Sequence, residues 1–310
     1  MILEIIVLIF GLAFLVMGSN LLVEGAIRLS KRIGLSKLFI GMTIVTIGTT
    51  TPELIVNVIS ALQGNSAVGL GNILGSNLFN ILVIIGLTAF FIKIKTTKNL
   101  AKDAFFALIA IGLVWAFSAV SLNEPTNTIS ALEGVAMLLL FACYMYFLIK
   151  GIPKEVKIIH VFETRSIELI GLGAFLLYAG GTIAVANSVE IARQLSISEF
   201  VIGATILAIG TSLPELSTCI IAALKKQQEI SVGNLVGSTI YNTLAILGIT
   251  AIISPINTEN YYKYFAFNAF AILLLVGFLY TGKKYHINRT EGALMLISYC
   301  LIFAVLLFNL

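Results

Sequence analysis

Two short motifs place a carboxylate beside a helix-breaking proline inside long apolar stretches. The first, GTTTPE, covers residues 48–53 and ends at Glu53, and the second, GTSLPE, covers 210–215 and ends at Glu215. An acid in so apolar a setting costs free energy unless a bound partner balances its charge. Two acids in matched settings predict one site shared by two parts of the chain, where the carboxylates bind cations or move protons.

Hydroxyl side chains accompany each acid at helical spacing. Positions i, i+3, i+4 and i+7 lie on one helical face. In the first motif these positions are Thr46, Thr49, Thr50 and Glu53, and in the second they are Ala208, Thr211, Ser212 and Glu215. Side chains and backbone here offer only oxygen, which favours Ca²⁺ or Na⁺ over Zn²⁺ or copper.

A second polar segment follows each motif, at residues 71–80 and 233–242. Each holds a Ser and an Asn four residues apart on one helical face, namely Ser76 with Asn80 and Ser238 with Asn242. We expect these side chains to complete the cation shell, and interhelical hydrogen bonding is the alternative. For Asn72 and Asn234 we expect a structural role as caps or in helix–helix bonds.

Proline also shapes the backbone of both motifs. Pro52 and Pro214 have no N–H to donate to the carbonyls of Gly48 and Gly210. Each half should therefore contain an apolar helix broken near its midpoint, and a bound cation would satisfy the freed carbonyls.

The elements that position these residues are membrane helices. Hydrophobic residues make up 59% of the chain, charged residues only 11%, and the mean hydropathy is +1.04. Apolar runs of this length indicate an all-α integral membrane protein rather than a β-barrel. We predict ten spans: 2–27, 38–62, 67–92, 101–121, 130–149, 167–189, 200–223, 230–254, 262–281 and 292–309.

Basic residues support this count. With ten spans, all but two of the 19 Lys and Arg residues fall on one side; only Arg193 and Lys263 fall opposite. The positive-inside rule then predicts a multi-pass protein of the cell membrane with both termini outside.

The chain repeats itself at a constant offset of 162 residues. Residues 41–54 match 203–216 at nine of 14 positions, and 71–91 match 233–253 at ten of 21. We therefore divide the chain into a five-helix repeat at 1–150 (core 41–91), a cytoplasmic linker at 151–165 and a second repeat at 166–310 (core 203–253). Five spans per repeat is an odd number, so the second repeat is inverted, as in secondary transporters.

The charge count favours exchange of ions. Glu53 and Glu215 together carry −2, which one Ca²⁺, two Na⁺ or two protons would neutralise, whereas three Na⁺ would leave +1. An empty pair of buried carboxylates is unfavourable, which argues for obligatory antiport. A membrane hydrolase lacks a nucleophile–base pair here, and a channel needs a continuous pore, so we expect neither an enzyme nor a channel.

With these residues in view, the chain resembles the sodium/calcium exchanger branch of the calcium/cation antiporter superfamily. The resemblance rests on residues 48–53 with 71–80 and on 210–215 with 233–242, and it covers essentially all ten spans. It implies that Glu53 and Glu215 bridge a central Ca²⁺ together with the backbone carbonyls of Thr49 and Thr211.

The same resemblance implies two flanking Na⁺ sites and a moving pair of helices. One site would use the Thr46 carbonyl, Thr49, Thr50, Ser76 and Glu53, and the other the Ala208 carbonyl, Thr211, Ser212, Ser238 and Glu215. Asn80 and Asn242 would line the middle. Spans 2–27 and 167–189 would slide across the remaining helices to alternate access.

Departures from the family pattern narrow the expected ions. Position 242 is Asn where some relatives place Asp, which disfavours potassium-dependent exchange, and neither 71–80 nor 233–242 holds the further acid typical of the proton-coupled branch. We expect Ca²⁺/Na⁺ exchange, with Ca²⁺/H⁺ or potassium-dependent exchange as alternatives. The expected partners are Ca²⁺, Na⁺ or H⁺, and the lipid bilayer, without nucleic acid, an obligatory protein partner, a cofactor or a regulatory domain.

Overall fold

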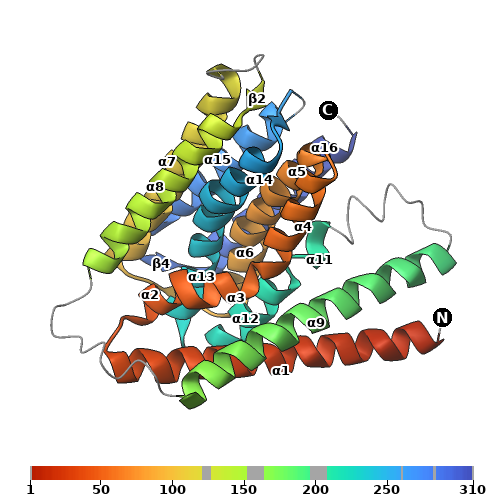
Figure 1. The fold of residues 1–310 in the computed structure, drawn as a ribbon. Helices are drawn as coiled ribbons and strands as arrows, with labels where there is room; N and C mark the ends of the chain where they lie inside the picture. Colours follow the sequence, from red (N-terminus) through yellow and green to blue (C-terminus); the bar gives the residue numbers. More distant parts are fainter. Residues whose placement is uncertain are drawn as a thin grey trace. The chain divides into compact units, whose positions relative to one another are not determined.

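The computed structural model is built almost entirely from helices (Figure 1). It describes residues 2–120, 127–151, 164–195, 208–259, 261–281 and 284–308. The chain divides into two compact units, Met1–Pro52 with Lys154–Asn234 and Glu53–Pro153 with Leu235–Leu310. Each unit thus combines segments from both sequence halves, and most of the predicted linker at 151–165 lies outside the described residues.

The first unit surrounds an apolar core. Its elements are α1 (Ile2–Ile33), α2 (Lys37–Ile40), the π-helical segment η1 (Gly41–Val45), α3 (Thr46–Thr49), α9 (Thr164–Gln194), α11 (Ala208–Gly210) and α12 (Leu213–Leu224). The core includes Leu22, Ile40, Leu177, Ala222 and Ile230, all fully buried. Two further helices, α4 (Thr51–Leu62) and α13 (Gln228–Ile240), begin in this unit and end in the other.

Glycines hold α1 and α9 together at very short range. The two helices run side by side (Figure 1). A Cβ on Gly18 of α1 would lie 2.8 Å from the carbonyl oxygen of Gly173 in α9. A Cβ on Gly173 would lie 2.6 Å from the backbone nitrogen of Leu22. Only glycine allows such a close approach of two backbones, as in small-residue interfaces of membrane helices.

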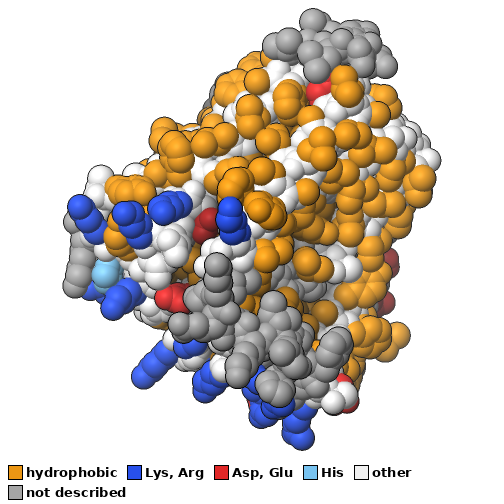
Figure 2. All heavy atoms as spheres, turned by 60° about the vertical axis from the view of Figure 1, so that its left-hand side comes forward, with side chains coloured by type: hydrophobic (Ala, Val, Ile, Leu, Met, Phe, Trp, Pro, Cys, Tyr) orange, Lys and Arg blue, Asp and Glu red, His pale blue; other side chains and the backbone are white. Residues whose placement is uncertain are grey.

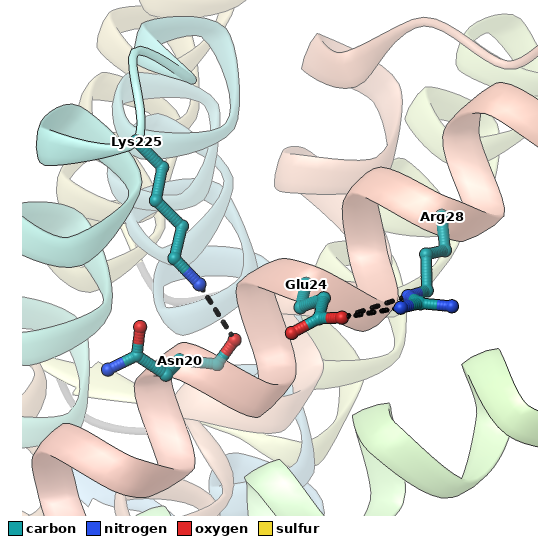
Figure 3. A network of polar contacts seen from close by, with 4 residues as sticks. All are labelled: Asn20, Glu24, Arg28 and Lys225. Carbon is teal, nitrogen blue, oxygen red and sulfur yellow. Dashed lines mark hydrogen bonds and ion pairs between the residues drawn. The ribbon is translucent and has the colours of Figure 1, made fainter.

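Polar contacts join α1 to α12 within the same unit. Figure 3 shows Lys225, at the end of α12, donating from Nζ to the Asn20 carbonyl of α1 at 3.2 Å. One turn further along α1, Glu24 and Arg28 form an ion pair at 2.7 Å. The hydroxyl of Ser19 also donates to that of Ser217 at 2.6 Å. Hydroxyl and charged groups therefore hold α12 on α1, whereas glycines hold α9 there.

The second unit contains the remaining helices and two very short strand pairs. Its elements are α5 (Ser66–Leu78), the π-helical η2 (Phe79–Ile84), α6 (Ile85–Phe91), β1 (Ile94–Lys95), α7 (Lys98–Val120), β2 (Thr128–Ile129), α8 (Ala131–Lys150), the π-helical η5 (Tyr241–Ile246), α14 (Leu247–Ile253), β3 (Ile256–Asn257), α15 (Tyr262–Tyr280), β4 (His286–Ile287) and α16 (Arg289–Phe308).

In the second unit, helices from one half of the sequence pack on helices from the other half. Helix α6 packs on α16, where a Cβ on Gly292 would lie 2.7 Å from the Gly86 oxygen. Its counterpart α14 packs on α8, where a Cβ on Gly134 would lie 2.8 Å from the Gly248 oxygen. The antiparallel strand pairs follow the same rule, because β1 joins β4 and β2 joins β3. A two-fold relation between the halves would produce this pattern of pairing.

Eight helices of the described residues are long and apolar enough to cross a membrane. A ninth span results if Lys37–Thr49 and Thr51–Leu62, which are bent by 49°, count as one. The predicted span 200–223 is represented by Leu213–Leu224, and its residues 200–207 lie outside the described part. Hydrophobic side chains cover much of the surface that Figure 2 shows. Exposed large hydrophobic residues of the described part include Leu139, Phe175 and Leu301. The chain is a multi-pass membrane protein.

Candidate functional site

The break predicted in the first half is present. Helix α3 ends at Thr49, Thr50 leaves the helical conformation at φ −86° and ψ 7°, and α4 begins at Thr51. Pro52 lies in the first turn of α4, where a missing N–H does no harm to the helix. Glu53 occupies the same turn and is fully buried.

The second half repeats this geometry. Helix α11 ends at Gly210, and Ser212 has φ −88° and ψ 6°, nearly the same values as Thr50. Pro214 stands at the start of α12, and Glu215 follows in the first turn, again fully buried. The structure therefore confirms both predicted breaks and gives the two glutamates equivalent local positions.

Threonine hydroxyls in the first unit donate to protein oxygens. The hydroxyl of Thr49, which lies beside the Glu215 carboxylate, donates to Asn234 Oδ1 at 3.1 Å or to the Thr46 carbonyl at 3.2 Å. The Thr50 hydroxyl donates to that same carbonyl at 2.7 Å. Because each hydroxyl proton has an acceptor, the oxygen lone pairs remain available to a cation.

The Thr46 carbonyl is the most heavily used acceptor of this group. It receives the Thr50 backbone N–H at 2.9 Å and the Thr50 hydroxyl at 2.7 Å. A cation bound to this carbonyl would have to replace one of these donors. Thr211 is half-buried in the turn between α11 and α12, whereas the side chain of Ala208 lies outside the described residues. The ligand roles of Thr46, Ala208 and Thr211 stay predictions.

The predicted ligands of the second unit are all fully buried: Glu53, Ser76, Asn80, Ser238 and Asn242. Asn80 and Asn242 are each the second residue of a π-helical segment, η2 and η5. A π-helical turn is rare and is frequent at functional sites. A π-helical turn at equivalent places in both halves therefore makes Asn80 and Asn242 candidates for a functional role.

Several buried polar groups among the predicted ligands of both units have no hydrogen-bond partner among the described residues. They are the hydroxyls of Ser212 and Ser238, both amide atoms of Asn80, and the Oδ1 atom of Asn242. Leaving a buried polar group unpaired costs about 1–3 kcal/mol. Oxygen atoms that lack donors in this way suit a cation, which accepts lone pairs and needs no proton.

Asparagines that sequence reasoning did not assign to the candidate site form hydrogen bonds with its predicted residues. Asn234, expected to be structural, does make helix–helix bonds, and it makes them to the hydroxyls of Thr46 and Thr49. Asn77 accepts from Asn242 Nδ2 at 3.1 Å, and Asn57 donates to the Glu53 carbonyl at 2.9 Å. Their one sequence signal is an amide inside an apolar run.

Comparison with known proteins shows the family of this chain. A model of the sodium/calcium exchanger protein family matches residues 3–150 and 166–308. The chain belongs to the sodium/calcium exchanger family. As a family member it is a transporter, and its cargo is cations moved by antiport.

Relatives of this exchanger match over nearly their whole length. A putative antiporter, CaxA of Alkalimonas amylolytica, is 32% identical, with 96% of this chain and 97% of the relative covered. The sodium/calcium exchanger MaX1 of Methanosarcina acetivorans is 27% identical, with 98% of each covered. A solved structure of the sodium-calcium exchanger NCX_Mj, soaked with Na⁺ and Sr²⁺, superposes with a TM-score of 0.87 at 29% identity and 98% coverage of both chains.

Proposed function

We propose that this exchanger moves Ca²⁺ against Na⁺ by alternating access, and that Glu53 and Glu215 bind the competing ions. The observation that carries the proposal is the matched pair of buried glutamates. Each is fully buried in the first turn of a helix that follows a break. Such groups persist in a membrane protein when an ion balances their charge.

The charge of the pair explains why the transport is an exchange. One Ca²⁺ neutralises two carboxylates, and two Na⁺ do the same. Moving an empty site through the membrane would carry two uncompensated charges, which is far more costly than moving a neutral complex. The site therefore changes its exposure with one kind of cargo or the other bound.

The remaining ligands are the oxygens of both motifs and both polar segments. We assign the side chains of Thr49, Thr50, Thr211, Ser212, Ser76, Ser238, Asn80 and Asn242, and the backbone carbonyls of Thr46, Ala208, Thr49 and Thr211. Ca²⁺ accepts six to eight oxygen ligands in flexible geometry. Hydroxyls whose protons are already directed to Asn234 and Thr46 suit this role.

We assign the alternating motion to α1 and α9, and both termini to the outside. The glycine contacts between α1 and α9 support this assignment, since two helices in backbone contact at Gly18 and Gly173 would move together. The Lys and Arg distribution supports the orientation of the termini.

Flux through the purified chain in proteoliposomes tests the proposal. An outward Na⁺ gradient should drive Ca²⁺ uptake that saturates with Ca²⁺. Uptake driven by a pH gradient without Na⁺ would instead show Ca²⁺/H⁺ exchange, and a requirement for K⁺ would show the potassium-dependent reaction. Linear, non-saturating flux without a counter-ion would indicate a channel.

Two substitutions test the assignment of the glutamates. Glu53→Gln and Glu215→Gln should each abolish exchange while the protein remains folded. Glu24→Gln is the matched control, because Glu24 is an exposed member of a surface ion pair with Arg28. Near-normal turnover in either site variant would contradict the proposed roles.

A further inference from the structure

A chain of three buried side chains links α5 to η5 inside the second unit. Asn77 Nδ2 donates to the Thr243 hydroxyl oxygen at 3.0 Å, and Asn242 Nδ2 donates to Asn77 Oδ1 at 3.1 Å. All three residues are at most 1% exposed. Hydrogen bonds between buried side chains are strong in so apolar an interior, and they hold these three side chains in one arrangement.

The direction of these hydrogen bonds fixes which atom of the Asn242 amide is bonded to Asn77 and which is not. Its nitrogen is bound to Asn77, so its oxygen points the other way and has no hydrogen-bond partner among the described residues. The two ends are not equivalent for a cation. A carbonyl oxygen binds a metal ion, whereas an N–H group presents a positive partial charge to it.

The first half of the chain cannot build the same arrangement. At the offset of 162, Asn80 corresponds to Asn242, but Asn77 corresponds to Thr239 and Thr243 to Ile81. The Thr239 hydroxyl donates to the Leu235 carbonyl of its own helix at 2.9 Å. Accordingly, neither amide atom of Asn80 has a partner among the described residues.

We propose that Asn77 is a positioning residue that holds the Asn242 amide with its oxygen, not its nitrogen, toward the transported cation. The inference rests on the proposed function, and it adds a residue that acts on the ion only through Asn242. Fixing a ligand in its binding orientation before the ion arrives removes part of the ordering cost of binding. Asn77 thereby orients the Asn242 ligand, which comes from the second half of the chain, before the ion binds.

Variants at position 77 test this inference in the purified full-length chain. Asn77→Leu keeps the volume but removes the acceptor for Asn242. A protonated Asp in Asn77→Asp is neutral, and it keeps both an acceptor for Asn242 Nδ2 and a donor to the Thr243 hydroxyl oxygen. Thr239→Val is the matched control, because it removes a buried hydroxyl at the corresponding position outside the chain of bonds. Each protein is assayed for Na⁺-driven Ca²⁺ uptake and for the rise in melting temperature that Ca²⁺ produces.

The expected result separates positioning from simple packing. Asn77→Leu should raise the half-saturating Ca²⁺ concentration about tenfold, the effect of one well-placed ligand, with a smaller change in maximal rate. With its carboxyl protonated, and so without a third negative charge, Asn77→Asp should return this concentration to the wild-type value, and Thr239→Val should leave it unchanged. Asn77→Ala replaces the Leu variant if that protein does not survive purification.

Contrary results are equally specific. An unchanged half-saturating concentration in Asn77→Leu, with normal exchange in the wild type, overturns the role of Asn77 alone. Equal impairment of the Leu and Asp variants shows that the residue acts through packing. Absence of Ca²⁺/Na⁺ exchange in the wild-type chain overturns the proposed function together with this inference.

Discussion

Asn57 and Gly69 fit so closely that a Cβ on Gly69 would lie 2.5 Å from the Asn57 amide oxygen. Asn57 is fully buried on α4 and donates from Nδ2 to the Glu53 carbonyl. At the offset of 162 the corresponding pair is Cys219 and Ser231, whose sulfur and hydroxyl oxygen are 2.7 Å apart. A larger residue packed against glycine in the first half thus corresponds to two small residues in the second half.

This relationship predicts the outcome of an exchange of pairs. Gly69→Ser alone should destabilise the protein by about 1–3 kcal/mol, the usual cost of overpacking, because its side chain displaces Asn57. Adding Asn57→Cys, which rebuilds the pair of the second half, should recover most of the loss. Thermal unfolding of the purified variants measures both effects. A Gly69→Ser protein as stable as wild type would show that α4 and α5 separate easily here.

The close packing of α1 and α9 gives a second prediction. Gly173→Ala should lower the melting temperature and abolish exchange, because its Cβ would meet the backbone of α1, which a side-chain rotation cannot relieve. Gly171→Ala is a control on the same helix, since a Cβ there has no atom within 4 Å. Melting curves and transport rates of the two variants provide the comparison. Equal behaviour of both would contradict the backbone contact.

Proline chemistry and periodicity made much of this architecture predictable. The breaks at Pro52 and Pro214 follow from a missing N–H, and the eight long apolar helices of the described residues follow from the length of the apolar runs. The constant offset also identified equivalent residues correctly, since Thr50 and Ser212 have nearly the same backbone angles.

Other features arise only when distant segments meet. The π-helical segments η2 and η5 carry no distinct sequence signal. The same residue types are compatible with an α-helix, and packing decides which hydrogen-bond register forms. The bonds of Asn77 to Thr243 and Asn242 span more than 160 residues, so spacing could not reveal them. The two-residue strands are likewise pairings between sequence halves, too short for any alternating pattern.

The hydroxyl of Thr49 supports a prediction about affinity. Thr49→Val keeps the side-chain shape but removes the oxygen of the buried hydroxyl that donates to Asn234 Oδ1. Losing one oxygen ligand should raise the half-saturating Ca²⁺ concentration by about tenfold or more. Thr250→Val is the control, since the Thr250 hydroxyl donates to the Ile246 carbonyl of its own chain segment. Comparable affinities in the two variants would remove Thr49 from the ligand set.

The final prediction concerns the charge at position 242. A protonated Asp in Asn242→Asp can still donate to Asn77 Oδ1, as the native amide does, and the pair of glutamates keeps its charge of −2. An ionised Asp has no proton to donate and adds a third negative charge that Ca²⁺ does not balance. Between about pH 5 and about pH 9, exchange by the variant should therefore fall relative to the wild type as the pH rises and the carboxyl loses its proton. Initial rates of Na⁺-driven Ca²⁺ uptake across this range, with wild type in parallel, measure the difference. Parallel profiles would mean that neither the proton on residue 242 nor its bond to Asn77 matters for transport.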